Sequence, residues 1–250
     1  MIIMLKDKKF RGTFSSVQVD EGEGAKVRRL FPTRQLSYFD PFVLFDEFFI
    51  EKPSGFPTHQ HRGFEFITYM LEGAIEHRDN MGNVRVVYAG GVQKANTGSG
   101  ISHSEMPVEP GVNHGIQLWV NLPRTLKAIN PEYQYAEEKE LPQIEDEGIM
   151  VRTIVGEGSP IRFHTSINYL EIVLAKGFEY EVVKKPEFNS LVYVISGSIE
   201  FGNVKVDTKK AAILNDEVSI TTTSGEDSRF IFISGKPLNQ PVQFRGPFVD

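Results

Sequence analysis

Four residues with metal-binding side chains occur as two pairs, and within each pair the spacing is two. His59 and His61 form the first pair, and His103 and Glu105 form the second. Because a β-strand places residues i and i+2 on one face, each pair can point to one side of its strand. If the two strands are neighbours, three imidazole nitrogens and one carboxylate converge. The sequence therefore predicts one metal site with the ligands His59, His61, His103 and Glu105.

A set of three nitrogen ligands and one oxygen ligand suits one divalent transition metal ion. Fe, Mn, Ni and Zn all fit this description. Four protein ligands leave positions open in a five- or six-coordinate shell, as in a catalytic metal site. A single His-x-His pair is as often structural as ligating, but two such pairs in one β-protein favour the metal.

The strands that must position these residues are visible as short runs of alternating apolar residues with turn residues between them. This pattern is typical of an antiparallel barrel or sandwich. Helical periodicity is scarce, so the fold class is predicted to be all-β. The clearest runs are residues 64–71, 83–88, 115–121, 169–174, 191–195, 198–201, 211–214 and 229–233.

The two halves of the chain resemble each other. Residues 71–77 and 195–201 each read as a strand, a glycine turn and a returning strand, which favours an internal duplication. The predicted division is an N-terminal metal-binding domain over residues 1–134, an acidic surface linker over 135–147, and a C-terminal domain over 148–250. A short exposed helix over residues 136–141 is an equal alternative within the linker. The C-terminal domain has no histidine beyond His164, so no metal is expected there.

Composition excludes several classes of protein. The 250 residues contain no cysteine, so disulfides, thiolate metal sites and cysteine nucleophiles are excluded. The formal net charge is −6, and no basic footprint predicts direct binding of nucleic acid. The apolar run at the N-terminus is too short for a signal peptide, and no segment approaches a membrane span. We expect a cytoplasmic protein that does not bind membranes, and a monomer.

Longer strings around the ligands resemble the pirin family of the cupin superfamily. They comprise residues 61–79, 97–105, 114–123 and 246–249. The resemblance implies two tandem cupin domains, each a jelly-roll β-barrel, facing each other, with one metal ion, usually iron, in the N-terminal domain alone. It favours Glu105 as the carboxylate ligand. Glu65, the position that ligates in many other cupins, is then a supporting group or a salt-bridge partner.

Other residues have weaker assignments. Phe56 and Met106 flank the ligand segments, and His114 precedes the predicted strand over residues 115–121. All three are predicted to contact a small-molecule substrate. His77 is expected on the exposed flank of a turn. Arg62 alternates with the ligand His61 and should point away from the metal, so a salt bridge is expected for it.

The resemblance also implies a function. Some pirins are iron-dependent dioxygenases of the quercetin 2,3-dioxygenase type, which act on a flavonol or a similar enol; here Glu105 would be the catalytic base. The alternative is a non-catalytic iron and redox sensor that binds a protein partner, as transcription cofactors do. A third hypothesis is another cupin chemistry on the same ligands, such as a Zn isomerase or a Mn oxidase.

Overall fold

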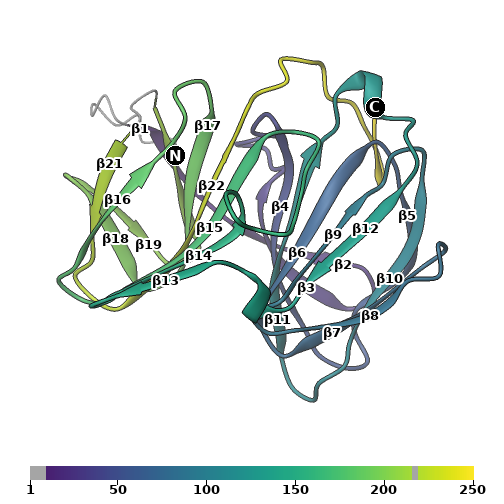
Figure 1. The fold of residues 1–250 in the computed structure, drawn as a ribbon, viewed down its shortest axis with the longest axis horizontal. Helices are drawn as coiled ribbons and strands as arrows, with labels where there is room; N and C mark the ends of the chain where they lie inside the picture. The colour runs from purple at the N-terminus through teal and green to yellow at the C-terminus, as the bar shows by residue number, and fades with distance from the viewer. Residues whose placement is uncertain (1–9, 216–218) are drawn as a thin grey trace. The chain divides into compact units, whose positions relative to one another are not determined.

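The protein is built almost entirely from β-strands. A computed structural model describes residues 10–215 and 219–250 (Figure 1). In these residues there is no α-helix, and helical structure is limited to two short 3₁₀ turns, η1 (Arg124–Leu126) and η2 (Glu138–Glu140). The all-β prediction is confirmed.

No helix in the described part of the chain has the length and apolar character needed to cross a membrane.

The strands form two compact units, and each unit is made of three separate segments of the chain. We call them the N-terminal barrel and the C-terminal barrel. The N-terminal barrel contains Val17–Glu140, Ile161–Thr165 and Leu238–Asp250. Among the described residues, the C-terminal barrel contains the segment that ends at Ser16, together with Leu141–Pro160 and Ser166–Pro237. These units depart from the predicted boundaries of 1–134, 135–147 and 148–250, because both chain ends pair with strands that are distant in sequence.

Two terminal segments show why the boundaries differ. Strand β1 (Phe10–Ser15) pairs with β20 (Lys210–Leu214), so the start of the described chain completes the C-terminal barrel. At the other end, the amide of Val249 donates to the carbonyl oxygen of Arg62 in the N-terminal barrel. Backbone pairing of this kind depends on register and leaves no mark in local composition.

The predicted linker is also largely structured. Strand β12 (Glu132–Ala136) pairs with β9 (Val92–Asn96), and β13 (Gln143–Asp146) pairs with β14 (Ile149–Val155), with η2 between β12 and β13. Both strands are sheet edges, and all four side chains of β13 are exposed. An edge strand can carry many charged residues, and for this reason the acidic segment resembled a linker.

The N-terminal barrel consists of two large antiparallel sheets and a two-stranded sheet of β23 (Phe244–Arg245) and β24 (Phe248–Val249). In the four-stranded sheet the order is β5-β10-β7-β8, and these strands lie side by side in Figure 1. They span Phe56–His61, Ile101–Pro107, Ala74–Asp79 and Val84–Tyr88. In the seven-stranded sheet the order is β12-β9-β6-β11-β4-β3-β2. Beyond β12, these strands span Val92–Asn96, Phe64–Glu72, Asn113–Asn121, Phe42–Ile50, Ala25–Phe31 and Val17–Glu21.

The C-terminal barrel repeats this plan with seven strands and four. The seven-stranded order is β1-β20-β17-β22-β15-β14-β13, and the four-stranded order is β16-β21-β18-β19. The remaining strands are β17 (Asn189–Ser196), β22 (Ser228–Gly235), β15 (Ile167–Leu174), β14 (Ile149–Val155), β16 (Glu179–Val183), β21 (Ser219–Thr223), β18 (Ser198–Phe201) and β19 (Val204–Asp207).

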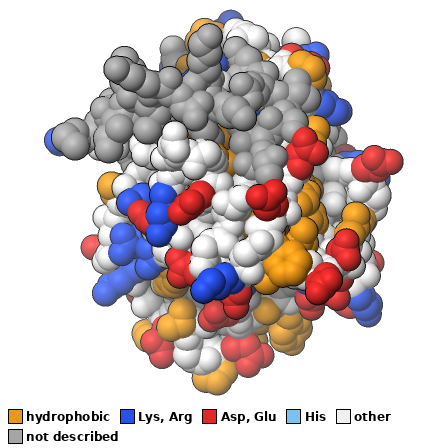
Figure 2. Space-filling view, turned by 90° about the vertical axis from the view of Figure 1, so that its left-hand side faces the viewer, with side chains coloured by type: hydrophobic (Ala, Val, Ile, Leu, Met, Phe, Trp, Pro, Cys, Tyr) orange, Lys and Arg blue, Asp and Glu red, His pale blue; other side chains and the backbone are white. Residues whose placement is uncertain are grey.

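On the face drawn in Figure 2, acidic side chains lie among the basic ones and interrupt any continuous basic surface.

The two similar sequence segments occupy equivalent places. Gly73 joins β6 to β7, and Gly197 joins β17 to β18. Their φ angles are 69° and 72°, in the left-handed region that favours glycine. A Cβ on Gly73 would lie 2.5 Å from Oδ1 of Asn113, and one on Gly197 would lie 2.4 Å from a backbone oxygen. The matching turns and the shared strand plan agree with the predicted duplication.

A buried ionic cluster connects residues 161–165 with the rest of the N-terminal barrel. Nζ of Lys94 lies 2.6 Å from Oε1 of Glu65, and both side chains are fully buried. His164 donates from its backbone amide to Oε2 of Glu65 at 3.0 Å, and its Nδ1 lies 3.0 Å from Oε1. The ring of Phe163 covers Nζ of Lys94. Glu65 is therefore a salt-bridge partner, as the family resemblance implied.

Removing one member of this buried pair should be costly. We expect Lys94→Met to lower the free energy of unfolding of the N-terminal barrel by about 3–5 kcal/mol, because it leaves a buried carboxylate without its cation. Urea titration followed by the fluorescence of Trp119, the only tryptophan, measures this change. The double variant Glu65→Leu, Lys94→Met should recover part of the loss. A loss below about 1 kcal/mol in the single variant would contradict this view of the cluster.

Candidate metal centre

Three histidines converge on the inner side of the N-terminal barrel. Strands β5 and β10 pair antiparallel, with His59 directly opposite His103. Nε2 of His59 lies 2.9 Å from Nε2 of His61 and 3.1 Å from Nε2 of His103. The three residues are a group whose ligand atoms all lie within 4.8 Å of one another. The predicted convergence of these three side chains is therefore present.

The tautomers of His59 and His61 follow from their second contacts. Nδ1 of His59 is 2.8 Å from the carbonyl oxygen of Pro57, and Nδ1 of His61 is 3.2 Å from that of Pro247. A carbonyl oxygen can only accept, so each Nδ1 carries the proton and each Nε2 presents a lone pair. Burial, together with the neighbouring His59, lowers the pKa of His61 to about 3, which keeps this imidazole neutral.

His103 is oriented by a longer chain of contacts. Nε2 of His77 lies 3.1 Å from Oδ2 of Asp79, a carboxylate oxygen that accepts. This leaves Nδ1 of His77 as an acceptor for Nδ1–H of His103, at 3.5 Å. Nε2 of His103 then also presents a lone pair toward the other two histidines. Burial is the main cause that lowers the pKa of His103 well below its usual value.

The expectation that His77 lies on an exposed turn flank is wrong. His77 and Asp79 are both on β7 with fully buried side chains, and the ring of His77 stacks on Tyr133 at 4.5 Å between centroids. Strand β7 runs beside β10, which turns His77 inward toward His103. The sequence could not show this, because the identity of the neighbouring strand depends on the sheet order.

The converging donor set fits a metal ion. Nε2 of His59 lies about 3 Å from Nε2 of both His61 and His103, and lone pairs at such separations repel one another unless a cation lies between them. Two imidazole nitrogens that both bind one ion at about 2.1 Å would lie about 3.0–3.4 Å apart, depending on the angle between them, and the separations of 2.9 and 3.1 Å are close to the lower end of this range. The contact that each Nδ1 makes behind the cluster is the usual way of fixing a ligating histidine.

Glu105 is buried on the same face of β10 as His103 but lies outside the group of mutually close ligand atoms. Its Oε1 accepts from Thr68 at 2.8 Å and from Gln93 at 2.5 Å, and its Oε2 accepts from Gln117 at 2.7 Å. All three partners donate, which suits an ionised carboxylate. Coordination of a metal by Glu105 stays a prediction.

The two glutamines that hold Glu105 are themselves oriented. Nε1–H of Trp119 donates to Oε1 of Gln117 at 3.0 Å, so the amide nitrogen of Gln117 must face Glu105. The hydroxyl of Tyr133 donates to Oε1 of Gln93 at 2.8 Å. Burial, with the nearby charge of Glu105, raises the pKa of Tyr133 and keeps this donor protonated. Sequence reasoning missed these residues, which look like ordinary polar positions in alternating strands.

A cavity of about 560 Å³ adjoins the histidine cluster and is lined by both His59 and His61. Aromatic and apolar side chains make up much of its wall, including Phe48, Phe56 and Trp119. This volume lies within the range of about 300–1,000 Å³ that is usual for small-molecule sites.

The predicted substrate contacts fall in different places. Phe56 lines the cavity, whereas His114 and Met106 are not among its lining residues. His114 stacks on Phe49 at 4.3 Å, and its Nε2 lies 2.9 Å from Oε1 of Glu47. Met106 alternates with Glu105 on β10 and so points away from the cluster. Substrate contact by these three residues stays a prediction, and for His114 and Met106 it lacks support from the geometry.

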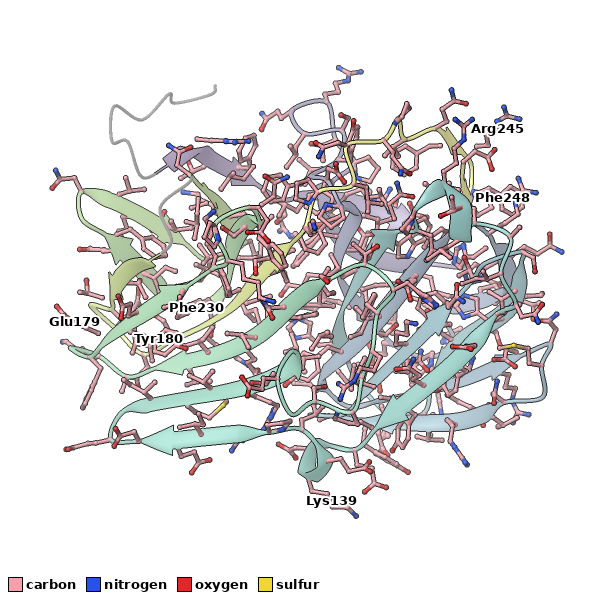
Figure 3. All side chains as sticks on the ribbon, turned by 45° about the horizontal axis from the view of Figure 1, so that its top comes forward. Lys139, Glu179, Tyr180, Phe230, Arg245 and Phe248 are labelled. Carbon is pink, nitrogen blue, oxygen red and sulfur yellow. The ribbon has the colours of Figure 1, made fainter. Side chains whose placement is uncertain are left out.

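The C-terminal hairpin forms one wall of this site. Strands β23 (Phe244–Arg245) and β24 (Phe248–Val249) are joined by Gly246 and Pro247, which line the cavity with Phe244. Figure 3 labels Arg245 and Phe248 on this hairpin. Arg62 pairs with Asp250 at 3.2 Å and lies over the ring of Phe248, so its predicted salt bridge is confirmed. Lys127 donates to the carbonyl oxygens of Gly63 and Val249 and anchors the hairpin.

The contact between His77 and His103 should matter for metal binding. We expect His77→Phe, which keeps the ring and its stacking on Tyr133, to lower the affinity for a divalent metal by about 10- to 100-fold. The cause is the loss of the acceptor that fixes His103. Competition against a chromophoric chelator measures the affinity. Arg78→Gln, on the exposed neighbour, is the matched control and should bind metal normally. Equal affinity of the two variants would contradict the role assigned to His77.

Comparisons with known proteins agree with this fold and site. The family model described as Pirin matches residues 24–120, and the model described as Pirin C-terminal cupin domain matches residues 169–250. A pirin of Rattus norvegicus is 37% identical over 98% of this chain and 88% of its own length. A pirin-like protein of Solanum lycopersicum is 38% identical over 92% of this chain and 82% of its own length.

Solved structures show the same relationship. A quercetin 2,3-dioxygenase from Acinetobacter baumannii superposes with a TM-score of 0.90 at 30% identity, covering 97% of this chain and 91% of that chain. The bacterial pirin YhhW from Escherichia coli, in complex with nickel(II), has a TM-score of 0.75 at 23% identity, covering 90% of this chain and 98% of its own. At that identity the likeness concerns the fold alone. The family models and the relatives over most of the chain show that this protein is a two-cupin-domain member of the pirin family.

Proposed function

We propose that the protein is a metal-dependent dioxygenase that cleaves a flavonol or a similar enol, with Fe(II) as its metal. The observation that carries the proposal is the convergence of three imidazole lone pairs at the wall of a cavity with aromatic lining. The likeness to a quercetin 2,3-dioxygenase from Acinetobacter baumannii supports the choice of reaction.

Several residues have roles in this reaction that follow from their positions. His59, His61 and His103 would hold the ion, and Glu105 is the candidate for a fourth ligand. A bound Fe(II) would supply Lewis acidity toward the enol hydroxyl and reactivity toward dioxygen.

The protein's own groups would bind the substrate and move its proton. The rings of Phe48, Phe56 and Trp119 would hold a flat substrate and exclude water. Glu105 would accept the enol proton as general base. Gln117 both lines the cavity and donates to Oε2 of Glu105, so it connects the substrate space with this carboxylate.

An aerobic assay with quercetin tests the reaction. We expect iron-loaded protein to remove the flavonol absorbance and to release one carbon monoxide per quercetin, faster than the same amount of free iron. His61→Ala should lower metal affinity by more than about 100-fold and abolish turnover, since it removes a ligand and not merely a supporting contact. Gln60→Ala is the matched control, because Gln60 lies between two ligands with its side chain exposed.

The outcomes separate the proposed enzyme from its main alternative. If iron is bound and turnover does not exceed that of free iron, the dioxygenase proposal is wrong. The iron-sensing, partner-binding hypothesis would then be the one to pursue. If His61→Ala keeps its metal content, the ligand assignment is wrong instead.

A further inference from the structure

Five neighbouring strands of the seven-stranded sheet carry a polar residue at the same level. Arg29 pairs with Asp46, Asp46 with Gln117, Gln117 with Thr68, and Thr68 with Gln93. We call these five residues the polar row. Each is the direct cross-strand neighbour of the next, so the row crosses β3, β4, β11, β6 and β9 without a break.

Apolar residues border the polar row on both sides. One side has Val27, Phe48, Gly115 and Met70, and the other has Leu44, Trp119, Phe66 and Ala95. A Cβ on Gly115 would lie 2.4 Å from the ring of Phe48, so the glycine leaves room for this ring. Polar side chains inside a barrel are costly unless they are paired, and an unbroken row of them therefore calls for a role.

Part of the polar row has its role in the metal centre. Thr68, Gln93 and Gln117 all donate to Glu105 from the facing sheet. The other two members, Arg29 and Asp46, pair with each other and line the cavity together with Gln117. The row thus runs from the carboxylate beside the histidines to an ionic pair in the cavity wall.

The ionic pair at this end has a defined charge and geometry. Arg29 donates from Nε to Oδ1 of Asp46 at 2.9 Å and from Nη2 to Oδ2 at 2.6 Å. Nη2 of Arg29 also lies 2.7 Å from Oε1 of Glu21. One guanidinium therefore faces two carboxylates, which gives the group a formal net charge of about −1 when both carboxylates are ionised.

This charge balance determines which ligand groups the cavity wall can take. A carboxylate offers about four acceptor positions on its two oxygens, so Asp46 can accept from hydroxyl groups in addition to Arg29. The positive charge of Arg29 is offset by two carboxylates, which makes the wall unfavourable for an anion. Phe48 and Phe56 lie on one side, 6.0 Å apart between centroids and at 84°, and Trp119 lies on the other. A flat ring with hydroxyl groups along its edge suits this arrangement.

We propose that Arg29 and Asp46 form a specificity subsite that accepts the hydroxyl groups of an uncharged, polyhydroxylated aromatic ring and rejects anionic substituents on that ring. The subsite rests on the proposed function, since it takes the cavity as the place where a flavonol-like substrate binds. It narrows the substrate class to neutral phenolic enols whose remote ring carries hydroxyl groups.

Binding can be measured without turnover because Trp119 is the only tryptophan and lines the cavity. Iron-loaded protein in the absence of dioxygen is titrated with three flavonols while Trp119 fluorescence is followed. The flavonols are quercetin, a flavonol without hydroxyl groups on the remote ring, and quercetin sulfonated on that ring. We expect quercetin to bind roughly 10-fold more tightly than either of the others.

Substitutions at the cavity wall then test whether the subsite causes the preference for quercetin. Asp46→Asn keeps the shape and removes one negative charge, so the rejection of the sulfonated flavonol should fall by roughly 10-fold. Glu21→Gln, at a side chain that is 40% exposed, should give a smaller relief and tests the idea if the buried variant does not fold. Glu23→Gln is the control, because this exposed carboxylate is near in sequence and does not line the cavity.

Three results would overturn the subsite. These are no binding of quercetin, equal affinity for the three flavonols in the unmodified protein, or the same preference in both Asp46→Asn and Glu21→Gln. The test is separate from the proposed reaction. If the protein binds the flavonols selectively but releases no carbon monoxide, the dioxygenase proposal is wrong and the subsite proposal holds. If it turns quercetin over but binds the three flavonols equally, the subsite proposal is wrong and the dioxygenase proposal holds.

Discussion

The mutual approach of three unprotonated imidazole nitrogens is the constraint on which the metal centre depends. Nε2 of His59 can lie about 3 Å from Nε2 of both His61 and His103 only if a cation offsets the repulsion of their lone pairs. Each ring is held with its proton on the far nitrogen, by a backbone carbonyl oxygen for two of them and by His77 for the third. Much of the surrounding structure serves this orientation, including the C-terminal hairpin that supplies the carbonyl of Pro247.

The facing sheet solves a related problem, which is how to keep a buried carboxylate in place. Glu105 receives donors from Thr68, Gln93 and Gln117, and the two glutamines are oriented by Trp119 and Tyr133. Buried polar networks are stable when every member is satisfied, and this one extends without a gap into the cavity wall. A barrel with an all-apolar interior could hold a metal at its mouth, but it could not connect the ion with a hydrogen-bonding substrate surface.

Local patterns were enough to predict part of this arrangement. The i, i+2 spacing of His59 with His61 and of His103 with Glu105 predicted one shared face for each pair, and the alternating runs predicted strands. The position of His77 was predicted wrongly, because its surroundings depend on β7 lying beside β10. The segment 135–147 was predicted as a linker, because edge strands tolerate the same charged residues as loops. The polar row and most of the cavity wall escaped prediction, since their members come from strands far apart in the chain.

By itself, the sequence determined the fold class, the family resemblance and the three histidines that converge. These follow from residue types and from the period of two along a strand, which are local properties. The tertiary structure alone decided the proton positions on the imidazoles, the partners of Glu105 and Glu65, and the membership of each barrel. It also decided that the last residues of the chain wall the site. These features depend on strand order and register, which arise when non-local backbone pairing brings distant residues to the same level of a sheet.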